Sequence, residues 1–546
     1  MLTRRDLVKC GITAATLSGF SPRLVHADDD DGVGRSPFRT NPFVEPLPFP
    51  PDKEPVGVGP ACRDALSSTG ATQANPGTHQ YIERTDCAPT KAYEIHVAEG
   101  VTSFHPNIPP TKIFGYDGIA PGPTFKAFYG EPIMVRFFNE LPADHVGFGI
   151  ASISTHLHNG HTASESDGFP GNFHDSRTFW DNHYINAANG FSADPPTTNG
   201  VTECMGTLWY HDHRQDFTAQ NVYAGLAGFY LLYDSLDCND ETDARGLQLP
   251  SGDFDVPLVF ADKVFDADGQ LFYDFFNLGG ILGDKYTVNG KIQPFFEVQP
   301  RKYRFRLLDA GPSRFYAFAL SDGTPLIQIA NDGNLLAAPI ARSVVTCGVA
   351  ERHDVIVDFS KYRPGDKVYL MNRAEQDDGR GPTGQLLTPG VPLVEFRVTL
   401  LAATDQSQIR PVLRPVPPMD LSQVVKTRTW EFDRSDGGWT VNDKFFNVNE
   451  VRASVKCNTC EVWTLKNGGG GWSHPIHIHL EEYRTLSRNG RTPPPWEDRK
   501  DVTVLGPDQV ARVFFNFRDF VGRYPMHCHN VVHEDHAMMI RFDVVP

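Results

Sequence analysis

Short runs in which apolar and polar residues alternate recur along the chain from about residue 91 to its end. One of them is Ala92-Tyr93-Glu94-Ile95-His96-Val97, and others cover residues 302–307 and 513–517. Successive side chains of a strand point to opposite faces of its sheet, so this period of two predicts half-buried β-strands. Many short strands separated by turns are typical of β-sandwiches, and the chain is therefore predicted to be all-β.

Two stretches without this alternation divide the chain into segments of sandwich size. Residues 234–255 are rich in turn formers, and residues 410–418 are rich in proline. At about 150 residues per domain, a chain of 546 residues suits three domains better than one. We expect β-sandwiches at residues 91–236, 250–405 and 420–546, preceded by a surface-wrapping extension at residues 28–90 that has no core of its own.

The first 27 residues are predicted to be a removable export signal. Arg4 and Arg5 precede a short apolar stretch and the sequence Val25-His26-Ala27, as in twin-arginine signals with a small-residue cleavage site. The apolar stretch is well short of the roughly 20 residues that a membrane span requires, and no later segment supplies one. A disordered basic tail is the alternative interpretation. We expect an exported protein, periplasmic or extracellular, with no membrane span.

The charge balance excludes one class of partner. Lys and Arg number 50 against 67 Asp and Glu, which gives a net charge of −17. Such a chain offers no basic face to neutralise a phosphate backbone, so nucleic acid is not an expected partner. We expect a monomer.

Half of the 20 histidines fall into four tight clusters, each of which contains a His-x-His motif. On a strand the two histidines of such a motif point to the same side. Four motifs supply eight imidazoles, too many for one tetrahedral zinc ion and suited to a centre of several metal ions. A single motif is more often a surface or zinc feature, but four in one chain favour the polynuclear centre. The motifs are His156-Leu157-His158, His211-Asp212-His213, His477-Ile478-His479 and His527-Cys528-His529, whereas His161, His174, His183, His353 and His536 lack this spacing and are taken as ordinary.

The same alternation separates a second metal site from the first. Cys528 lies between two histidines and so faces away from both, and His474 lies an odd number of residues before His477. A thiolate, two imidazoles and a distant thioether are the ligands of blue copper centres. His533 and Met538 complete this set, with Met539 as the alternative to Met538.

The remaining cysteines leave their pairing open. Cys10 belongs to the predicted signal, and seven others remain besides Cys528, so at least one thiol stays unpaired within the chain. Cys457 and Cys460 are predicted to form a structural disulfide, with a redox or zinc motif as the alternative. The full set is Cys62, Cys87, Cys204, Cys238, Cys347, Cys457 and Cys460.

The histidine segments resemble the four copper motifs of the three-domain multicopper oxidases, and most closely the branch of bilirubin oxidases and bacterial spore-coat laccases. The resemblance covers about residue 90 to the end and includes Tyr286-Thr287-Val288-Asn289-Gly290-Lys291. It implies three cupredoxin-like Greek-key β-sandwich domains, with a type 1 copper in the third and a trinuclear copper cluster between the first and third. The segments are Thr155-His156-Leu157-His158-Asn159-Gly160, Leu208-Trp209-Tyr210-His211-Asp212-His213, residues 471–479 and residues 527–539.

The resemblance implies four copper ions: one type 1, one type 2 and two type 3. His156 and His477 match the type 2 ligands. A reductant is expected to give up one electron at a time through a solvent-facing edge of His474, and dioxygen to become water at the cluster. The residues that match the type 3 ligands are His158, His211, His213, His479, His527 and His529.

Three further residues match functional positions of the family. Asp167 and Glu534 match acids that relay protons near the cluster. Asp167 is equally well read as a turn residue before Gly168, and Glu534 alternatively orients a neighbouring ligand. Trp472 matches an indole that borders the type 1 site and can be joined to the histidine. The run of four glycines at residues 468–471 loosens this loop, and packing over the sheet is the alternative for Trp472.

These matches imply an oxidase that uses dioxygen and small organic reductants such as phenols, aminophenols or tetrapyrroles. Trp472, the glycine run and residues 493–496 are expected to form an aromatic, adaptable rim. A metal-ion oxidase for cuprous, ferrous or manganous ions would share every ligand, although 8 Met leave no Met-rich insert for cuprous ion. A structural cupredoxin repeat would have lost ligands, and a copper nitrite reductase lacks eight trinuclear histidines.

Overall fold

The computed structural model describes residues 33–68, 70–75, 77–187, 204–401, 404–416 and 419–546. Strands make up 45% and helices 6% of the chain, so the prediction of an all-β fold is confirmed. The predicted export signal lies outside the described residues. Within the described ranges, no helix is long and apolar enough to cross a membrane.

The first sandwich packs two sheets around a core that includes Tyr93, Ile95, Phe137, Leu157 and Tyr210. One sheet has the order β2-β4-β7-β11-β3 with β5 on β4, and the other has the order β6-β13-β12-β9. A two-stranded sheet of β8 (Ser152–Ile153) and β10 (His174–Asp175) lies outside these two. The strands are β2 (Gly57–Val58), β3 (Thr72–Gln73), β4 (Lys91–Thr102), β5 (Thr111–Tyr116), β6 (Phe125–Phe128), β7 (Ile133–Asn139), β9 (Thr155–His158), β11 (Thr178–Tyr184), β12 (Thr207–Asp212) and β13 (Ala227–Tyr233).

The second sandwich has a separate core that includes Leu258, Phe305, Phe318, Val355 and Phe396. Its sheets have the orders β17-β16-β14-β19-β24-β21-β22 and β18-β26-β25-β20-β23. The strands are β14 (Asp255–Lys263), β16 (Lys285–Val288), β17 (Lys291–Ile292), β18 (Phe295–Val298), β19 (Lys302–Asp309), β20 (Tyr316–Leu320), β21 (Leu326–Asn331), β22 (Asn334–Arg342), β23 (Val345–Cys347), β24 (Arg352–Asp358), β25 (Lys367–Ala374) and β26 (Leu386–Val398).

The third sandwich encloses the core that holds Cys528 and Met538 together with Trp439, Trp463 and Phe515. Its sheets have the orders β28-β27-β30-β35-β32-β33 and β29-β37-β36-β31-β34. The strands are β27 (Val424–Ser435), β28 (Gly438–Val441), β29 (Val451–Lys456), β30 (Thr459–Asn467), β31 (His474–Ile478), β32 (Tyr483–Arg488), β33 (Arg499–Lys500), β34 (Val502–Leu505), β35 (Val510–Phe517), β36 (Gly522–Cys528) and β37 (Met539–Val545).

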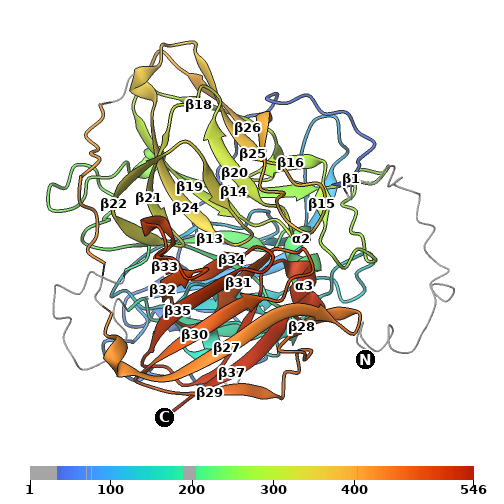
Figure 1. Ribbon diagram of the computed structural model, residues 1–546, viewed down its shortest axis with the longest axis vertical. Helices are drawn as coiled ribbons and strands as arrows, with labels where there is room; N and C mark the ends of the chain where they lie inside the picture. Colours follow the sequence, from blue (N-terminus) through green and yellow to red (C-terminus); the bar gives the residue numbers. More distant parts are fainter. Residues whose placement is uncertain (1–32, 69, 76, 188–203, 402–403, 417–418) are drawn as a thin grey trace.

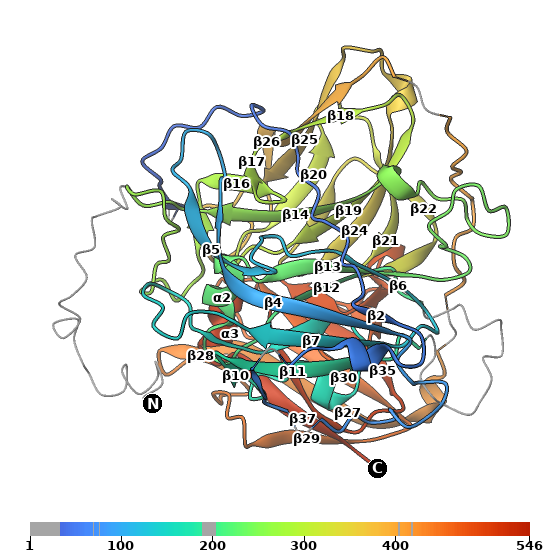
Figure 2. The same cartoon turned by 180° about the vertical axis from the view of Figure 1, so that it is seen from behind.

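The three sandwiches meet in one body. The second sandwich, drawn in yellow and green, lies above the third in Figure 1, and the first lies below it on the reverse side in Figure 2. The short helices α2 (Thr218–Ala224) and α3 (Val531–Asp535) meet where the first and third sandwiches face each other, and Asp535 accepts a hydrogen bond from Ala219 N at 3.0 Å. The residues at which the domains begin and end stay predictions.

The segment before β4 adds small pieces to all three sandwiches. β1 (Val33–Gly34) pairs with β15 (Leu282–Gly283), and β2 and β3 extend the first sandwich. Leu47 packs in the second core and Cys87 in the third.

Burial explains which strands show the alternating pattern. β4 and β35 alternate because one face packs on a core and the other meets solvent. Every residue of β12 and β31 is buried, because these strands lie between two sandwiches. Each histidine motif begins on a strand: β9 contains both of its histidines, whereas His213, His479 and His529 directly follow β12, β31 and β36.

The predicted disulfide between Cys457 and Cys460 does not form. Both residues are unbonded thiols at the turn between β29 and β30. Cys457 packs against the third core, whereas the Cys460 sulfur lies 3.7 Å from Asn516 Oδ1 on the neighbouring strand. β29 pairs with β37 and β30 with β27 and β35, so the turn passes from one sheet to the other and the two side chains meet different neighbours, which the spacing alone did not reveal.

Candidate metal centre

Four strands carry the histidine motifs to the contact between the first and third sandwiches. β9 pairs with β12, which puts His156 beside His211. β31 pairs with β36, which puts His477 beside His527. None of the eight histidines of the four motifs exposes more than 1% of its surface. The structure therefore brings together in one buried cluster the eight imidazoles that the sequence assigned to a polynuclear centre.

The rings also contact one another within the pair and the two trios that the resemblance implies. The pair is His156 and His477, whose Nε2 atoms are 3.4 Å apart. In the first trio, His527 Nε2 lies 3.1 Å from His213 Nε2 and 3.2 Å from His479 Nε2. The second trio is His158, His211 and His529, with ring centroids 5.1, 5.2 and 5.7 Å apart. The pair contains the residues matched to type 2 ligands, and the trios contain the six matched to type 3 ligands.

Asp167 orients two of these rings from outside the cluster. Its Oδ2 accepts a hydrogen bond from His479 Nδ1 at 2.8 Å, and its backbone carbonyl accepts one from His156 Nδ1. Gly168 follows with a φ of +78°, and a Cβ there would lie 2.4 Å from the Thr155 carbonyl oxygen. Asp167 thus occupies the tight turn that one interpretation predicted and also contacts the cluster, whereas its part in proton relay stays a prediction.

Glu534, on α3, faces the other end of the cluster. Its Oε2 lies 2.9 Å from His527 Nδ1, and its Oε1 lies 3.4 Å from His213 Nδ1. Burial raises the pKa of Glu534, but these two imidazoles outweigh it and bring the pKa down to about 2. The ionised carboxylate holds both rings in the orientation that turns their Nε2 atoms towards each other.

The electrostatics of the cluster suit metal ligands. Burial, reinforced by the neighbouring imidazoles, lowers the pKa of His211 to about 3 and takes that of His529 well below its ordinary value. Neutral imidazole is the form that binds metal. Within the part of the chain that the structure describes, His211 Nε2, His158 Nδ1 and both nitrogens of His529 are buried without a hydrogen-bond partner. Unsatisfied buried nitrogens are rare and costly, and a bound cation would satisfy them.

The second site lies on the opposite face of β36. Cys528 Sγ is 3.5 Å from His474 Nδ1 and 3.6 Å from His533 Nδ1, and these two nitrogens are 3.2 Å apart. All three residues are buried, and burial raises the pKa of the thiol far above its ordinary value. A buried thiolate requires a cation beside it, so the geometry fits a thiophilic metal ion.

The two methionine candidates point into different cores. Met538 packs in the same cluster as Cys528, and its backbone carbonyl accepts a hydrogen bond from Cys528 N at 3.0 Å. Met539 packs with Phe446 and Ala537 in a separate cluster. The packing therefore favours Met538 as the thioether of the second site.

The expected solvent-facing edge of His474 is wrong. His474 exposes 1% of its surface, and His533 exposes none. His533 Nε2 donates to the Gly279 carbonyl at 3.0 Å, so backbone from the second sandwich covers the site. Trp439 covers it from another side, with its ring centroid 3.8 Å from that of His533 and 5.6 Å from that of His474.

Trp472 lies one ring further out. Its ring centroid is 5.2 Å from that of Trp439, and its side chain is only partly buried against the third core. The guanidinium carbons of Arg380 and Arg434 lie 4.7 and 5.3 Å from its centroid. Trp472 thus forms an outer aromatic surface with two cations, rather than the immediate wall of the histidines.

Residues 493–496 do not belong to this rim. Trp496 packs against the cluster that contains Leu247 and Leu335, and Arg342 of the second sandwich lies over its ring at 3.9 Å. The segment follows β32 away from Trp472, and proximity in sequence to His474 did not reveal this.

Two residues of the site carried no signal in the sequence. Trp439 is part of a hairpin with no motif, and its Nε1 donates to the Leu278 carbonyl at 2.8 Å. Asp501 lies 3.4 Å from His158 Nε2, and its backbone carbonyl accepts a hydrogen bond from His477 Nδ1 at 2.9 Å. Of the histidines taken as ordinary, His161 pairs with Asp519 at 3.0 Å and belongs to neither site.

Known proteins resemble the chain over nearly its whole length. Two sequence profiles described as multicopper oxidase match residues 98–237 and 415–546. A bilirubin oxidase of Albifimbria verrucaria is 33% identical over 515 residues, which span 92% of this chain and 81% of that protein. A laccase of Bacillus stratosphericus is 31% identical over 506 residues, which span 83% of this chain and 94% of that protein.

Solved structures share the fold. A crystal structure of a multicopper oxidase from Pediococcus acidilactici matches with a TM-score of 0.74 at 22% identity, covering 95% of this chain and 94% of that chain. A multicopper oxidase from Campylobacter jejuni, described as a metallo-oxidase, matches with a TM-score of 0.68 at 17% identity, covering 94% and 99%. The cupredoxin-like architecture predicted from the sequence is therefore confirmed.

Proposed function

Because the chain belongs to the multicopper oxidase family, we propose that it couples the one-electron oxidation of small organic reductants to the four-electron reduction of dioxygen to water. The observation that carries the proposal is the buried cluster of eight imidazoles with unsatisfied nitrogens, adjoining a separate Cys528 site. Metal ions bound at the cluster would satisfy these buried nitrogens.

We infer that four copper ions bind to these residues. The type 1 ion would be held by Cys528, His474, His533 and Met538, and the other three by the eight histidines of the four motifs. Copper at these positions would supply one-electron redox chemistry at the Cys528 site and reduction of dioxygen at the histidine cluster. The main chain supports this coupling, because Cys528 is bonded directly to His527 and His529.

Acidic residues of the chain serve the proton supply. Reduction of dioxygen to water consumes protons inside a cluster from which bulk water is excluded. Glu534 Oε2 lies 2.9 Å from His527 Nδ1, and Asp167 Oδ2 lies 2.8 Å from His479 Nδ1. Both carboxylates hold the ring protons that keep the Nε2 atoms free, and we propose that both also pass protons towards the cluster.

The reductant is proposed to bind at Trp472. Its ring is partly exposed and lies under the guanidinium groups of Arg380 and Arg434. Aromatic faces and positive charge favour flat organic donors, above all anionic ones, and repel hydrated metal cations. Trp439 bridges the distance from Trp472 to His533 and His474 by ring contacts, so a donor need not touch a histidine.

A metal-ion oxidase remains the second candidate, because the ligand set is the same. Asp378 lies 3.5 Å from Arg380 and offers a carboxylate near the proposed binding surface. The two arginines over Trp472 weigh against a cationic substrate, and for this reason the organic donor is preferred.

The protein is proposed to act after export, in the periplasm or outside the cell, with its signal in the first 27 residues. This proposal rests on the twin arginines and the apolar stretch that follows them.

Oxygen uptake by the copper-loaded protein tests the function. The donors should include bilirubin, a neutral phenol, an aminophenol, a carboxylated phenol, and ferrous, cuprous and manganous ions at matched concentrations. Consumption of one dioxygen per four one-electron oxidations, without release of hydrogen peroxide, is expected. Faster uptake with any metal ion than with every organic donor would replace the organic assignment by the metal-ion one.

A further inference from the structure

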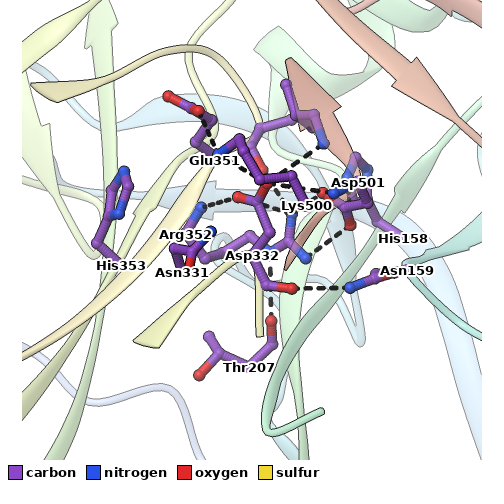
Figure 3. A network of polar contacts seen from close by, with 12 residues as sticks. His158, Asn159, Thr207, Asn331, Asp332, Glu351, Arg352, His353, Lys500 and Asp501 are labelled. Atoms are coloured by element: carbon purple, nitrogen blue, oxygen red, sulfur yellow. Dashed lines mark hydrogen bonds and ion pairs between the residues drawn. The ribbon is translucent and has the colours of Figure 1, made fainter. Parts of the chain in front are cut away.

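A buried network of charged residues joins the second sandwich to the wall of the histidine cluster, as Figure 3 shows. Arg352, at the start of β24, exposes none of its surface. Its NH1 and NH2 groups donate to Asp501 Oδ1 and Oδ2, both at 2.8 Å. This bidentate ion pair joins the second sandwich to the third, because Asp501 lies in the turn between β33 and β34.

Asp501 contacts two histidines of the cluster. Its Oδ2 lies 3.4 Å from His158 Nε2, and its backbone carbonyl accepts the hydrogen bond from His477 Nδ1. His158 comes from the first sandwich and His477 from the third. One residue, held by the second sandwich, thus adjoins rings from both sides of the cluster.

His158 is turned the opposite way to the other histidines that contact a residue outside the cluster. His156, His477 and His479 direct Nδ1 outward to an acceptor and leave Nε2 inside. His158 instead places Nε2 3.4 Å from the Asp501 carboxylate, a contact without hydrogen-bond geometry, and neither of its ring nitrogens has a hydrogen-bond partner among the described residues. The Asp501 carboxylate thus lies beside Nε2 of His158, whereas the other three rings turn Nδ1 towards their acceptors.

Asp332 fixes the backbone on which this carboxylate stands. Its Oδ2 accepts hydrogen bonds from Asp501 N at 3.3 Å and Val502 N at 3.2 Å. Its Oδ1 accepts one from Arg352 N at 3.2 Å, and its backbone carbonyl accepts one from Asn159, the neighbour of His158, at 2.8 Å. Asp332, in the second sandwich, thus fixes the backbone of Asp501 and contacts the residue next to His158.

Lys500 balances part of the negative charge. Its Nζ lies 3.0 Å from Asp332 Oδ2 and 2.7 Å from Glu351 Oε1. Without Arg352, the Asp501 carboxylate would be buried without its bidentate partner, which favours rearrangement of the carboxylate.

We propose that Arg352 is a positioning residue for the histidine cluster: it holds the Asp501 carboxylate against His158 Nε2, so that the second sandwich, which contributes no histidine to the cluster, controls how firmly the cluster retains copper. This inference rests on the proposed function, since it requires copper at the eight histidines. It assigns a role to a domain that otherwise only covers the Cys528 site.

The test compares Arg352→Gln with wild type in the full chain loaded with copper. Glutamine keeps one donor and removes the charge and the second hydrogen bond. Loss of a residue that orients a metal ligand costs about 10- to 100-fold in metal affinity, so copper of the cluster should be lost at about 10- to 100-fold lower chelator concentration. The blue absorption of the Cys528 site should remain, while the paramagnetic resonance signal of the type 2 ion changes.

Arg306→Gln is the matched control. Arg306 is equally buried in the second sandwich, pairs through two contacts at 2.7 Å with Asp255, and reaches Thr207 Oγ1 at 2.7 Å. The Arg352 side chain also donates to the backbone carbonyl of Thr207 at 3.2 Å. Of these two arginines, only Arg352 contacts Asp501. The control should lower thermal stability without lowering copper retention by the cluster.

Arg352→Lys keeps the inference testable if the glutamine variant does not fold. Lysine keeps the positive charge but cannot donate two parallel hydrogen bonds to one carboxylate. Copper retention should therefore lie between those of wild type and Arg352→Gln. Retention equal to wild type in Arg352→Lys and Arg352→Gln, or equal losses in Arg306→Gln, would overturn the inference and leave the proposed function standing. A wild-type protein that binds no copper at the cluster would overturn both.

Discussion

Cys528 is the residue on which the two metal sites depend together. Its sulfur contacts His474 and His533, and its backbone continues into a histidine of the cluster on each side. We expect Cys528→Ser to abolish the blue absorption and the oxidation of reductants, because serine supplies no thiolate. The fold and the copper of the histidine cluster should persist. Absorption spectra and copper content check this, and an intact blue band would mean that the type 1 site lies elsewhere.

Met538 is expected to tune the reduction potential of the type 1 site. Replacement by leucine keeps the volume in the core that Met538 shares with Cys528 and removes the weak axial donor. The oxidised ion loses more stabilisation than the reduced one, so the potential should rise in Met538→Leu. Redox titration of the blue band measures it. Met539→Leu is the matched control, and a potential that moves only in that variant would reverse the assignment.

Glu534 contacts His213 and His527 and, in the proposed function, would stand where protons are consumed. Glu534→Gln keeps the shape and leaves one oxygen to accept from a ring, but the amide cannot carry a proton. Reduction of dioxygen should therefore slow more than reduction of the blue site by the donor. Stopped-flow kinetics separate the two steps. Slowing of both steps to the same extent, or of neither, would leave Glu534 with an orienting role alone.

At the scale of elements, the hairpin of β27 and β28 builds the proposed donor surface. It places Trp439 against the two histidines and Arg434 over Trp472, and the loop after β25 adds Arg380. From the surface inward, the exposed arginines lie over Trp472, Trp472 contacts Trp439, and Trp439 contacts the two histidines. In the proposed function, electrons would therefore enter through this hairpin and loop rather than through an exposed imidazole.

Removal of the two guanidinium groups should change donor preference. An exposed cation over an aromatic ring contributes up to about 1 kcal/mol, so Arg380→Gln and Arg434→Gln should each raise the KM of a carboxylated phenol by up to about fivefold. The KM of a neutral phenol should change little. Arg245→Gln, which removes an arginine with 90% of its side chain exposed beside Asp243, serves as the control. Equal effects on both donors would remove the arginines from donor binding.

At the scale of the whole molecule, many histidines are buried in their neutral form. Burial lowers the pKa of His211 and His474 to about 3 and that of His213 to about 4. Unfolded histidine has a pKa of about 6.5, so below that pH the unfolded chain binds protons that the folded chain does not. The free energy of unfolding of the copper-free protein should therefore fall as the pH drops from about 6.5 towards 5.

Thermal unfolding of the copper-free protein at a series of pH values tests this. Buried acids act in the opposite direction, because burial raises their pKa, but the buried histidines with a lowered pKa outnumber them. These acids are Asp167, Asp212, Asp309, Glu351 and Asp501. Copper that binds only the folded chain should raise the unfolding temperature throughout. A copper-free protein whose stability stays constant or rises between pH 6.5 and 5 would contradict the prediction.

The sequence by itself predicted the all-β fold and the residues that gather at each of the two candidate metal sites. Strand periodicity is local, so His527 and His529 had to share a side and Cys528 had to face the other. The same rule sent His474 to the Cys528 site. The alternating strand pattern also predicted that the middle third of the chain, which has no histidine cluster, forms a sandwich like the other two.

Only the tertiary structure decided what surrounds these ligands. Asp501, Arg352 and Trp439 act through partners from other sandwiches or distant strands, and no short-range pattern records such partners. The burial of His474 was set by backbone of the second sandwich at Gly279, and the place of Trp496 by its contact with Arg342. Periodicity fixes the direction of a side chain relative to its own strand, whereas exposure and second contacts depend on how three separately formed cores pack against one another.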